Sequence, residues 1–247
     1  MFAVLLYHGI EDGAPSARQM DDVDREYVLD RRRFESHVAY LATRPATAVP
    51  VVISFDDGDA SCHTMAAPIL ERHELRGSFF VVTRWIGQPG FMDADQLRDL
   101  VRRGHSVSSH SRTHPRLPSL SATDLDDELL GSKADLEAIL GRPVTQFSIP
   151  GGAYDDRVID AARRAGYQTV FNSVEGYNDD DAGTFLRRRF TPRAYSEVAM
   201  LREICEHPAR TKARIAAKRT LLGGVRAVMG GRYDRLRTYV VSAFRRR

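Results

Sequence analysis

An apolar run over residues 48–55 ends in two adjacent carboxylates and a glycine, Asp56, Asp57 and Gly58. A run that stops at acidic residues is typical of a buried strand that delivers carboxylates to its C-terminal end, and Gly58 allows the chain to turn away. No other stretch constrains the fold as strongly, because it requires a buried strand with polar chemistry at one edge of a sheet.

A pair of histidines follows a second apolar-to-polar transition further along the chain. His110 and His114 are separated by three residues and come directly after a predicted strand. Two histidines and one carboxylate from another strand end can form a three-ligand metal site with room left for water. Each motif alone is weak, because Asp-Asp-Gly often forms only a turn and a histidine pair is commonly solvated. Together they favour a metallohydrolase.

Predicted strands and helices alternate through most of the chain. We expect strands over residues 2–7, 48–55, 77–83, 105–109, 144–149, 167–171 and 184–190. We expect helices over residues 30–41, 61–74, 93–103, 121–140 and 155–165, with Thr123 or Asp124 capping the longest of them. Roughly seven strands, most of them followed by a helix, predict a parallel α/β sheet, either open or closed into a barrel. In both arrangements active-site groups lie at the C-terminal ends of the strands.

Composition sets the broad class of protein. The 247 residues suffice for one large α/β domain. The two cysteines, Cys62 and Cys205, have no CxxC spacing, which fits a reducing compartment. The N-terminal apolar run is short and has no basic region before it, unlike a signal peptide, and no stretch approaches the ~20 apolar residues of a membrane span. We therefore expect a cytoplasmic protein.

Two segments resemble the motifs of a known family. The segment Ser54-Phe55-Asp56-Asp57-Gly58 and the segment His110-Ser111-Arg112-Thr113-His114 are similar to the first two motifs of the polysaccharide deacetylases with a NodB-like domain, the family 4 carbohydrate esterases. The resemblance covers about residues 2–195. It implies a distorted (β/α) barrel of about seven parallel strands and a divalent metal, most often Zn²⁺. It also implies hydrolysis of an N-acyl group on an amino sugar.

The resemblance also implies roles for individual residues. Asp57, His110 and His114 would bind the metal, and Asp56 would be the general base that takes a proton from the attacking water. The family's third motif, Arg-x-Pro-Tyr-Gly, is replaced here by residues 148–152, with Ser148 where the arginine that braces the catalytic aspartate usually stands. The oxyanion and substrate contacts expected from this segment are the Gly151 N–H together with Pro150 and Tyr154.

The family's general acid belongs to a Leu-x-His motif that usually lies near the C-terminus. Here the matching segment is N-terminal, Leu6-Tyr7-His8, as in a circularly rearranged branch of the family that acts on exopolysaccharide. First and last strands are neighbours in a closed barrel, so His8 is the expected acid; the alternative is a strand-end histidine that binds a buried carbonyl. One arginine of residues 187–189 is expected to reach the site as a charge partner, but the sequence does not say which. Trp85 is expected in the core, with sugar stacking as the alternative.

The C-terminal segment is strongly basic. Residues 210–247 contain twelve Lys or Arg and one acid, so they carry +11, and since the whole chain carries +3, residues 1–209 carry −8. We divide the chain into a deacetylase domain, 1–200, and a basic helical extension, 201–247. The extension is expected either to pack on the barrel or to bind an anionic membrane surface on the inner face, where each basic residue is worth ~1 kcal/mol. Nucleic acid is not an expected partner, because no reading motif is present.

The leading hypothesis is a metal-dependent N-deacetylase of an amino sugar in a polysaccharide, an oligosaccharide or a lipid-linked glycan. A hydrolase of another carbon–nitrogen amide bond, such as a deformylase, stays open because Ser148 and Gly151 depart from the third motif. A non-catalytic carbohydrate-binding module of the same fold is the third hypothesis.

Overall fold

Seven parallel strands form the central sheet of the protein. The computed structural model describes residues 1–13, 25–179 and 183–229, and of residues 222–229 only the helical backbone. The sheet order follows the chain: β1 (Ala3–Tyr7), β4 (Val51–Phe55), β5 (Gly77–Val81), β6 (Ser106–Ser109), β7 (Gln146–Ser148), β8 (Thr169–Phe171) and β9 (Leu186–Arg187). Every neighbouring pair is parallel, which confirms the predicted fold class. Two short strands, β2 (Ile10–Glu11) and β3 (Leu29–Asp30), pair separately.

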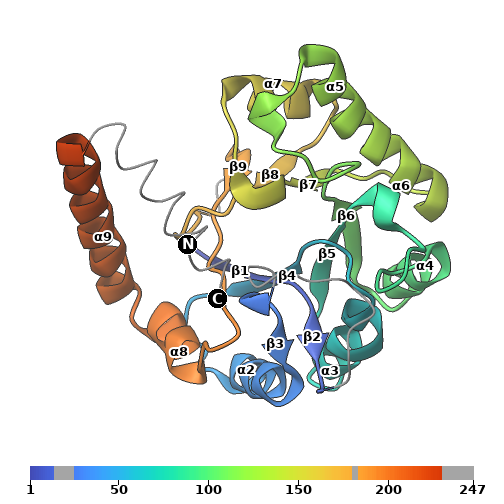
Figure 1. Ribbon diagram of the computed structural model, residues 1–247. Helices are drawn as coiled ribbons and strands as arrows, with labels where there is room; N and C mark the ends of the chain where they lie inside the picture. Colours follow the sequence, from blue (N-terminus) through green and yellow to red (C-terminus); the bar gives the residue numbers. More distant parts are fainter. Residues whose placement is uncertain (14–24, 180–182, 230–247) are drawn as a thin grey trace.

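The sheet curls until its first strand meets the segment that follows its last strand. The Leu6 N–H donates to the Phe190 carbonyl and the Phe190 N–H donates to the Val4 carbonyl, both at 2.8 Å. Residues at the end of β1 and just beyond β9 are therefore neighbours (Figure 1), although almost the whole domain separates them in sequence.

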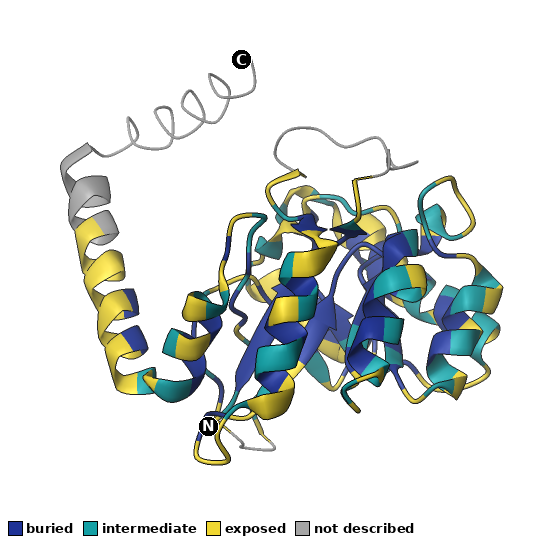
Figure 2. Cartoon of the chain, turned by 90° about the horizontal axis from the view of Figure 1, so that it is seen from below, coloured by how far each residue is buried: buried dark blue, intermediate teal, exposed yellow. Residues whose placement is uncertain are grey.

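Helices lie on the outer side of the curled sheet (Figures 1 and 2). They are α2 (Arg31–Thr43), α3 (Ala67–Glu71), α4 (Ala94–Arg102), α5 (Ala122–Asp126), α6 (Ser132–Leu140), α7 (Asp156–Arg164), α8 (Val198–Glu206) and α9 (Pro208–Met229). The predicted helix 121–140 consists of α5 and α6 joined by a π-helical turn, Asp127–Gly131. Its N-cap is Ser121, whose hydroxyl accepts from the Asp124 N–H. The predicted caps are wrong, because Thr123 and Asp124 already lie in the first helical turn.

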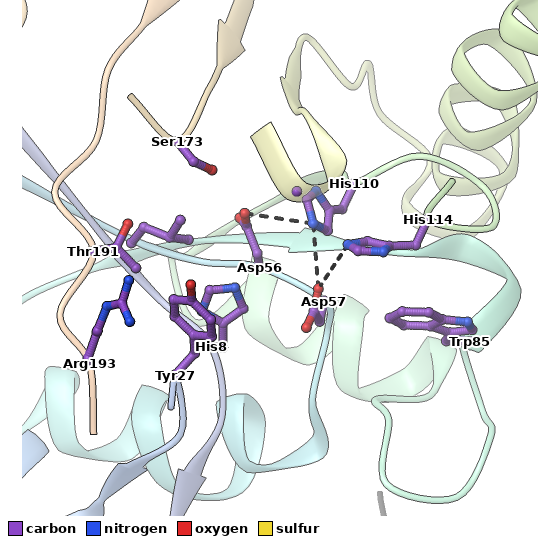
Figure 3. A pocket seen from close by; sticks show the side chains of 12 residues that line it. His8, Tyr27, Asp56, Asp57, Trp85, His110, His114, Ser173, Thr191 and Arg193 are labelled. Carbon is purple, nitrogen blue, oxygen red and sulfur yellow. Dashed lines mark ion pairs between the residues drawn. The ribbon is translucent and has the colours of Figure 1, made fainter. Parts of the chain in front are cut away.

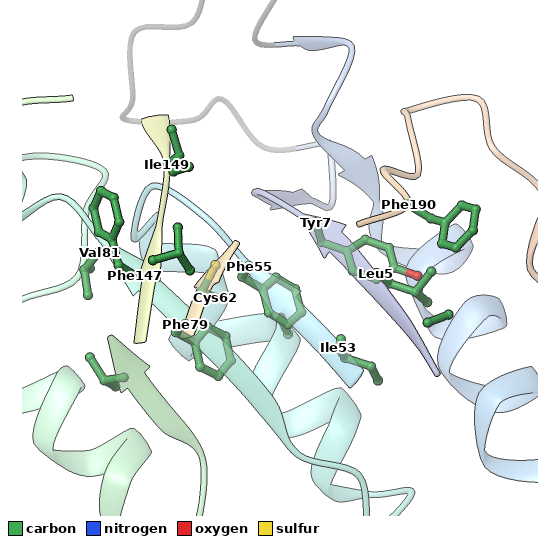
Figure 4. Close-up of a cluster of buried hydrophobic side chains, with 14 of the residues drawn as sticks. Leu5, Tyr7, Ile53, Phe55, Cys62, Phe79, Val81, Phe147, Ile149 and Phe190 are labelled. Atoms are coloured by element: carbon green, nitrogen blue, oxygen red, sulfur yellow. The ribbon is translucent and has the colours of Figure 1, made fainter. Parts of the chain in front are cut away.

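Aromatic side chains fix the first strands relative to one another. The rings of Phe55 and Phe79, on β4 and β5, stack at 4.8 Å between centroids, and Tyr7 of β1 packs against Phe55 at 5.6 Å. These side chains are almost completely buried (Figure 4). Burying rings of this size supplies much of the stabilisation of such a core. Because the strands are held in register, the polar residues that follow each strand are also held in place.

The first part of α9 packs against the body of the protein. Thr211 is fully buried and donates to the Glu203 carbonyl, and Ile215 is 7% exposed. The expected boundary at residue 200 falls inside α8, whose Leu201 and Ile204 are also buried. Within the described residues no helix has the length and apolar character needed to span a bilayer. The end of the basic extension, residues 230–247, lies outside the described residues.

Candidate functional site

Polar residues that follow three of the strands line one cavity. His8 follows β1, Asp56 and Asp57 follow β4, and His110 follows β6. The cavity has a volume of about 520 Å³. Its lining is Leu6, His8, Tyr27, Asp56, Asp57, Trp85, His110, His114, Gly151, Ser173, Thr191 and Arg193 (Figure 3). The curled parallel sheet therefore brings together side chains from distant parts of the chain, as the sequence predicted.

Asp57, His110 and His114 converge within the cavity as a group suited to a metal ion. Their ligand atoms all lie within 4.8 Å of one another. Asp57 Oδ1 is 3.5 Å from His110 Nε2 and 3.6 Å from His114 Nε2. The His110 Nδ1–H donates to the Ser148 carbonyl at 2.8 Å, which fixes the tautomer and leaves Nε2 as a free ligand atom. Two imidazole nitrogens and one carboxylate oxygen fit a Zn²⁺-type site.

The backbone that carries these ligands has an unusual conformation. Asp57, Ser111 and His114 have φ angles of 74°, 67° and 62°, in the left-handed region that residues other than glycine seldom adopt. Gly58 follows with φ 86°, and a Cβ atom there would lie 2.2 Å from a methyl group of Val81. Such conformations persist only where surrounding contacts enforce them, and they concentrate at functional sites.

A buried glutamate holds the loop between the two histidines. Glu128 is 6% exposed and accepts from the Arg112 N–H at 2.8 Å, the Thr113 N–H at 2.9 Å and the Thr113 hydroxyl at 2.5 Å. It belongs to the π-helical turn between α5 and α6, and such turns are frequent at functional sites. The sequence interpretation missed this residue; the available signal was an acid on the inward face of the helix beside Leu129.

A second carboxylate, Asp56, is clamped next to the metal-type group. Its two oxygens accept from Arg189 Nη1 and Nη2 at 2.9 and 2.8 Å, and Oδ2 also accepts from the Ser148 hydroxyl at 2.8 Å. Both Asp56 and Arg189 are buried. Burial acts to raise the pKa of Asp56, but the charges of Arg189 and His110 and the Arg189 hydrogen bonds outweigh it, so the pKa lies below its ordinary value. Asp56 is therefore held as a carboxylate.

The structure distinguishes the three consecutive arginines. Arg189 is the arginine that donates to Asp56, and it also donates from Nε to the Asn172 carbonyl at 2.9 Å. Arg187 lies over the ring of Phe2. The backbone of Arg188 is bonded to Asn178 instead. Ser148 stands where the third motif is expected to supply a bracing arginine, and in this chain the guanidinium of Arg189, from beyond β9, contacts Asp56.

His8 lies in the same cavity, on the side away from His114 (Figure 3). Its ring packs against Tyr27 at 5.1 Å between centroids. Its Nδ1 is buried and has no hydrogen-bond partner within the described part of the chain. Burial lowers the pKa of His8, while the negative charges of Asp57 and Asp56 act to raise it. The alternative interpretation is that the His8 ring donates to a buried carbonyl. Nδ1 makes no such hydrogen bond in the described part of the chain.

The remaining predicted residues are divided between the cavity and its surroundings. Gly151 lines the cavity with φ 58°, and a Cβ there would meet nothing within 4 Å. Pro150 is buried and is not among the residues that line the cavity. Tyr154 is not among the residues that line the cavity, and its expected contact with a substrate stays a prediction. The Tyr154 ring is 38% exposed, and its hydroxyl lies 3.5 Å from Asn172 Nδ2.

Trp85 is also placed differently from the core position expected for it. It lines the cavity next to the metal-type group, with its ring 5.3 Å from that of His114 and 4.9 Å from that of Phe91. Figure 3 shows it at the end of the cavity opposite Arg193. An aromatic ring in this position provides an apolar wall for a ligand.

A carboxylate–histidine–histidine group that could hold a metal ion thus lies beside a second, clamped carboxylate at the strand ends of a curled parallel sheet. The family model for polysaccharide deacetylase matches residues 43–170, and the chain belongs to this family. The matched segment contains Asp56, Asp57, His110 and His114, whereas His8 and Arg189 lie on either side of it.

Individual relatives agree with this family. The chain is 31% identical over 142 residues to a chitooligosaccharide deacetylase of Sinorhizobium fredii, covering 55% of this chain and 64% of that one. It is 30% identical over 127 residues to the peptidoglycan-N-acetylmuramic acid deacetylase PdaA of Bacillus subtilis, covering 50% of this chain and 46% of that one. A Streptococcus pyogenes deacetylase solved with acetate shares the fold, with a TM-score of 0.68, 20% identity and coverage of 81% and 96% of the two chains.

Proposed function

We propose that the protein is a metal-dependent hydrolase that removes an N-acetyl or other N-acyl group from an amino sugar in a polysaccharide, an oligosaccharide or a lipid-linked glycan. The observation that carries this proposal is the convergence of Asp57, His110 and His114 next to the ionised Asp56. The names of the relatives, which include chitooligosaccharide and peptidoglycan deacetylases, support an N-acetylated glycan as the substrate class.

Asp57, His110 and His114 would hold the cation, and their donor set favours Zn²⁺. A divalent cation in such a site polarises a carbonyl oxygen and lowers the pKa of water towards ~7. Asp56 is the proposed general base. It is ionised, and its Oδ2 lies 3.7 Å from Nε2 of the proposed metal ligand His110, so it can reach a water bound beside that nitrogen. Arg189 and the Ser148 hydroxyl leave its carboxylate little freedom to rotate.

The other two steps of amide cleavage have their own candidate groups. The Gly151 N–H is the proposed oxyanion donor, since the residue lines the cavity without a side chain to obstruct the carbonyl. His8 is the proposed general acid, because an amine leaves only when it is protonated. It lines the same cavity as the metal-type group, on the side away from His114 (Figure 3), so it can reach the amine of an amide bound there.

The proposal is tested by bound-metal stoichiometry together with acetate release from N-acetylated oligosaccharides. Asp56→Asn should keep the metal and lose turnover, whereas His114→Ala should lose the metal. Equal metal loss in both variants would contradict these roles. Release of formate from N-formyl amides without acetate release would favour another amide hydrolase, and glycan binding without any hydrolysis would favour a binding module.

A further inference from the structure

A second groove continues from the catalytic cavity. It has a volume of about 410 Å³ and shares three lining residues with the cavity, namely Ser173, Thr191 and Arg193. Its other lining residues come from the segment before β9, from the segment between β9 and α8, and from helices α8 and α9; they include Glu175, Tyr195, Glu203, Arg214 and Lys218. A ligand with its reacting group beside Asp57 therefore has a continuous path towards α9.

Two cations of α9 face this groove and share one carboxylate. Arg214 and Lys218 are one helical turn apart, so they project from the same face of the helix. Arg214 Nη2 lies 2.5 Å from Glu175 Oε1, and Lys218 Nζ lies 3.3 Å from Glu175 Oε2. Burial acts to raise the pKa of Glu175, but the two cations outweigh it and lower the pKa, so the carboxylate is ionised. One carboxylate neutralises only one of the two cations, which leaves an excess positive charge.

These cations remain accessible to a ligand. The side chains of Arg214 and Lys218 are 51% and 60% exposed. The other carboxylate in the groove, that of Glu203, is already paired with Arg210 at 3.2 Å. Half-exposed cations bind an added anion without a large desolvation cost, and a guanidinium matches the oxygen geometry of phosphate in particular.

Arg193 connects the groove to the catalytic cavity. Its guanidinium lies 5.4 Å from the centre of the Tyr27 ring, which in turn packs on His8, and it pairs with Glu26 at the surface. Nearby, Tyr195 is 67% exposed on the groove wall. An exposed aromatic ring that lines the same groove as these cations is suited to stacking on a sugar ring.

Resting on the proposed function, we infer that the substrate carries an oxyanion, such as a phosphate, on the glycan beyond the sugar that loses its acyl group. The N-acyl group occupies the metal end of the cavity. The glycan passes Arg193 and Tyr195, and the anion is bound by Arg214 and Lys218. The competing interpretation is that these cations serve only to dock α9 on Glu175.

The test compares N-acetylated mono-, di- and trisaccharides, each with and without a terminal phosphate, on the full-length metal-loaded protein. For at least one length we expect the phosphate to raise kcat/KM about tenfold at low salt, and we expect this gain to decline as salt screens the charges. In the double variant Arg214→Gln/Lys218→Gln the gain should disappear. The matched control is Lys212→Gln, which removes a charge from the same helix outside this groove and should keep the gain. No gain at any length, or the same gain in the double variant, overturns the inference.

A binding measurement separates this inference from the proposed function. If no acetate is released, calorimetry can still compare the affinities of wild type, Lys212→Gln and the double variant for the phosphorylated trisaccharide. Any binding of the phosphate to the metal is the same in all three proteins and does not affect the comparison. About tenfold weaker binding by the double variant alone supports the groove; equal binding refutes it. Loss of binding to anionic vesicles by the double variant, without any change towards the phosphorylated glycan, would assign these cations to a membrane surface instead and would also refute it.

Discussion

Arg189 donates from both terminal nitrogens to the two carboxylate oxygens of Asp56, at 2.9 and 2.8 Å, across 133 residues of sequence. The pair is buried next to the cavity, and the Ser148 hydroxyl completes it by accepting from Arg189 Nη2 at 2.8 Å while it donates to Asp56. A guanidinium from beyond β9 thus braces the proposed base from a position that the family's third motif does not supply in this chain.

Replacing this arginine should damage both stability and turnover. Arg189→Gln leaves the Asp56 carboxylate buried without its countercharge, and loss of one partner of a buried pair typically costs about 3–5 kcal/mol. We expect a lower free energy of unfolding, measured by denaturant titration, and kcat reduced by at least about 10²-fold with the bound metal retained. The neighbouring Arg188→Gln is the control, since Arg188 does not line the catalytic cavity. Comparable losses of stability and turnover in both variants would show that the effect does not depend on the contact between Arg189 and Asp56.

The proposed acid can be tested through the leaving group. His8→Ala should slow hydrolysis of an N-acetyl sugar by about 10²–10⁴-fold, because the departing amine needs a proton. Hydrolysis of an activated acetate ester should be much less affected, since its leaving group departs as an anion. The ratio of the two rates is the measured quantity. The control is His63→Ala, because His63 pairs with Asp99 outside the cavity. If both substrates slow equally in His8→Ala, another group supplies the proton.

Glu128 is expected to act through the metal-binding loop. Glu128→Ala leaves the Arg112 and Thr113 N–H groups unpaired, so the loop that holds His110 and His114 loses its anchor. We expect metal affinity to fall about 10–100-fold, measured by competition with a chelating indicator. Glu128→Gln keeps one oxygen for the two N–H groups and can donate to the Thr113 hydroxyl, so it should recover most of the affinity. Affinity equally poor in both variants would point to the carboxylate charge rather than to the loop contacts.

The glycine after Asp57 offers a test of local packing. Gly58→Ala places a methyl group 2.2 Å from Val81 on a backbone with φ 86°, so it should destabilise the protein by more than the ~1 kcal/mol typical of alanine in the left-handed region. Gly141→Ala is a matched control, because Gly141 has φ 64° with nothing within 4 Å of the added atom. Thermal unfolding of the two variants should separate the destabilisation caused by the clash with Val81 from the destabilisation caused by the left-handed backbone. Equal losses would mean that Val81 moves aside without cost.

Stability should decrease with acidification through His105. Burial lowers the pKa of His105 below 6.5, although its contact with Glu71 acts in the opposite direction. The unfolded chain therefore binds more protons than the folded one just below pH 6.5, and the free energy of unfolding should fall as pH drops through that value. His105→Gln should reduce the slope of unfolding free energy against pH below about 6.5, measured by denaturant titration at several pH values. An unchanged slope would assign the effect to other groups, such as the buried His37.

The sequence predicts the strands and the metal-type group well, and the physical reason is local. Apolar runs that end in Asp56 or His110 mark both the buried strand and its functional end. Arg189 could not be identified among its neighbours, because its contact with Asp56 depends on the curvature that brings the two ends of the sheet together. Glu128 was missed for a related reason, since a π-helical turn shifts the inward face away from simple helical spacing.

The meeting of β1 with the segment around Phe190 has a consequence for how activity arises during synthesis. All three metal-type ligands and Asp56 belong to the central part of the chain, but His8 is made first and Arg189 among the last residues of the barrel. A nascent polypeptide would therefore contain the proposed metal ligands and the proposed base before Arg189 is available to brace that base. Hydrolytic competence would begin only when the final turn of the sheet has wrapped back onto the first strand.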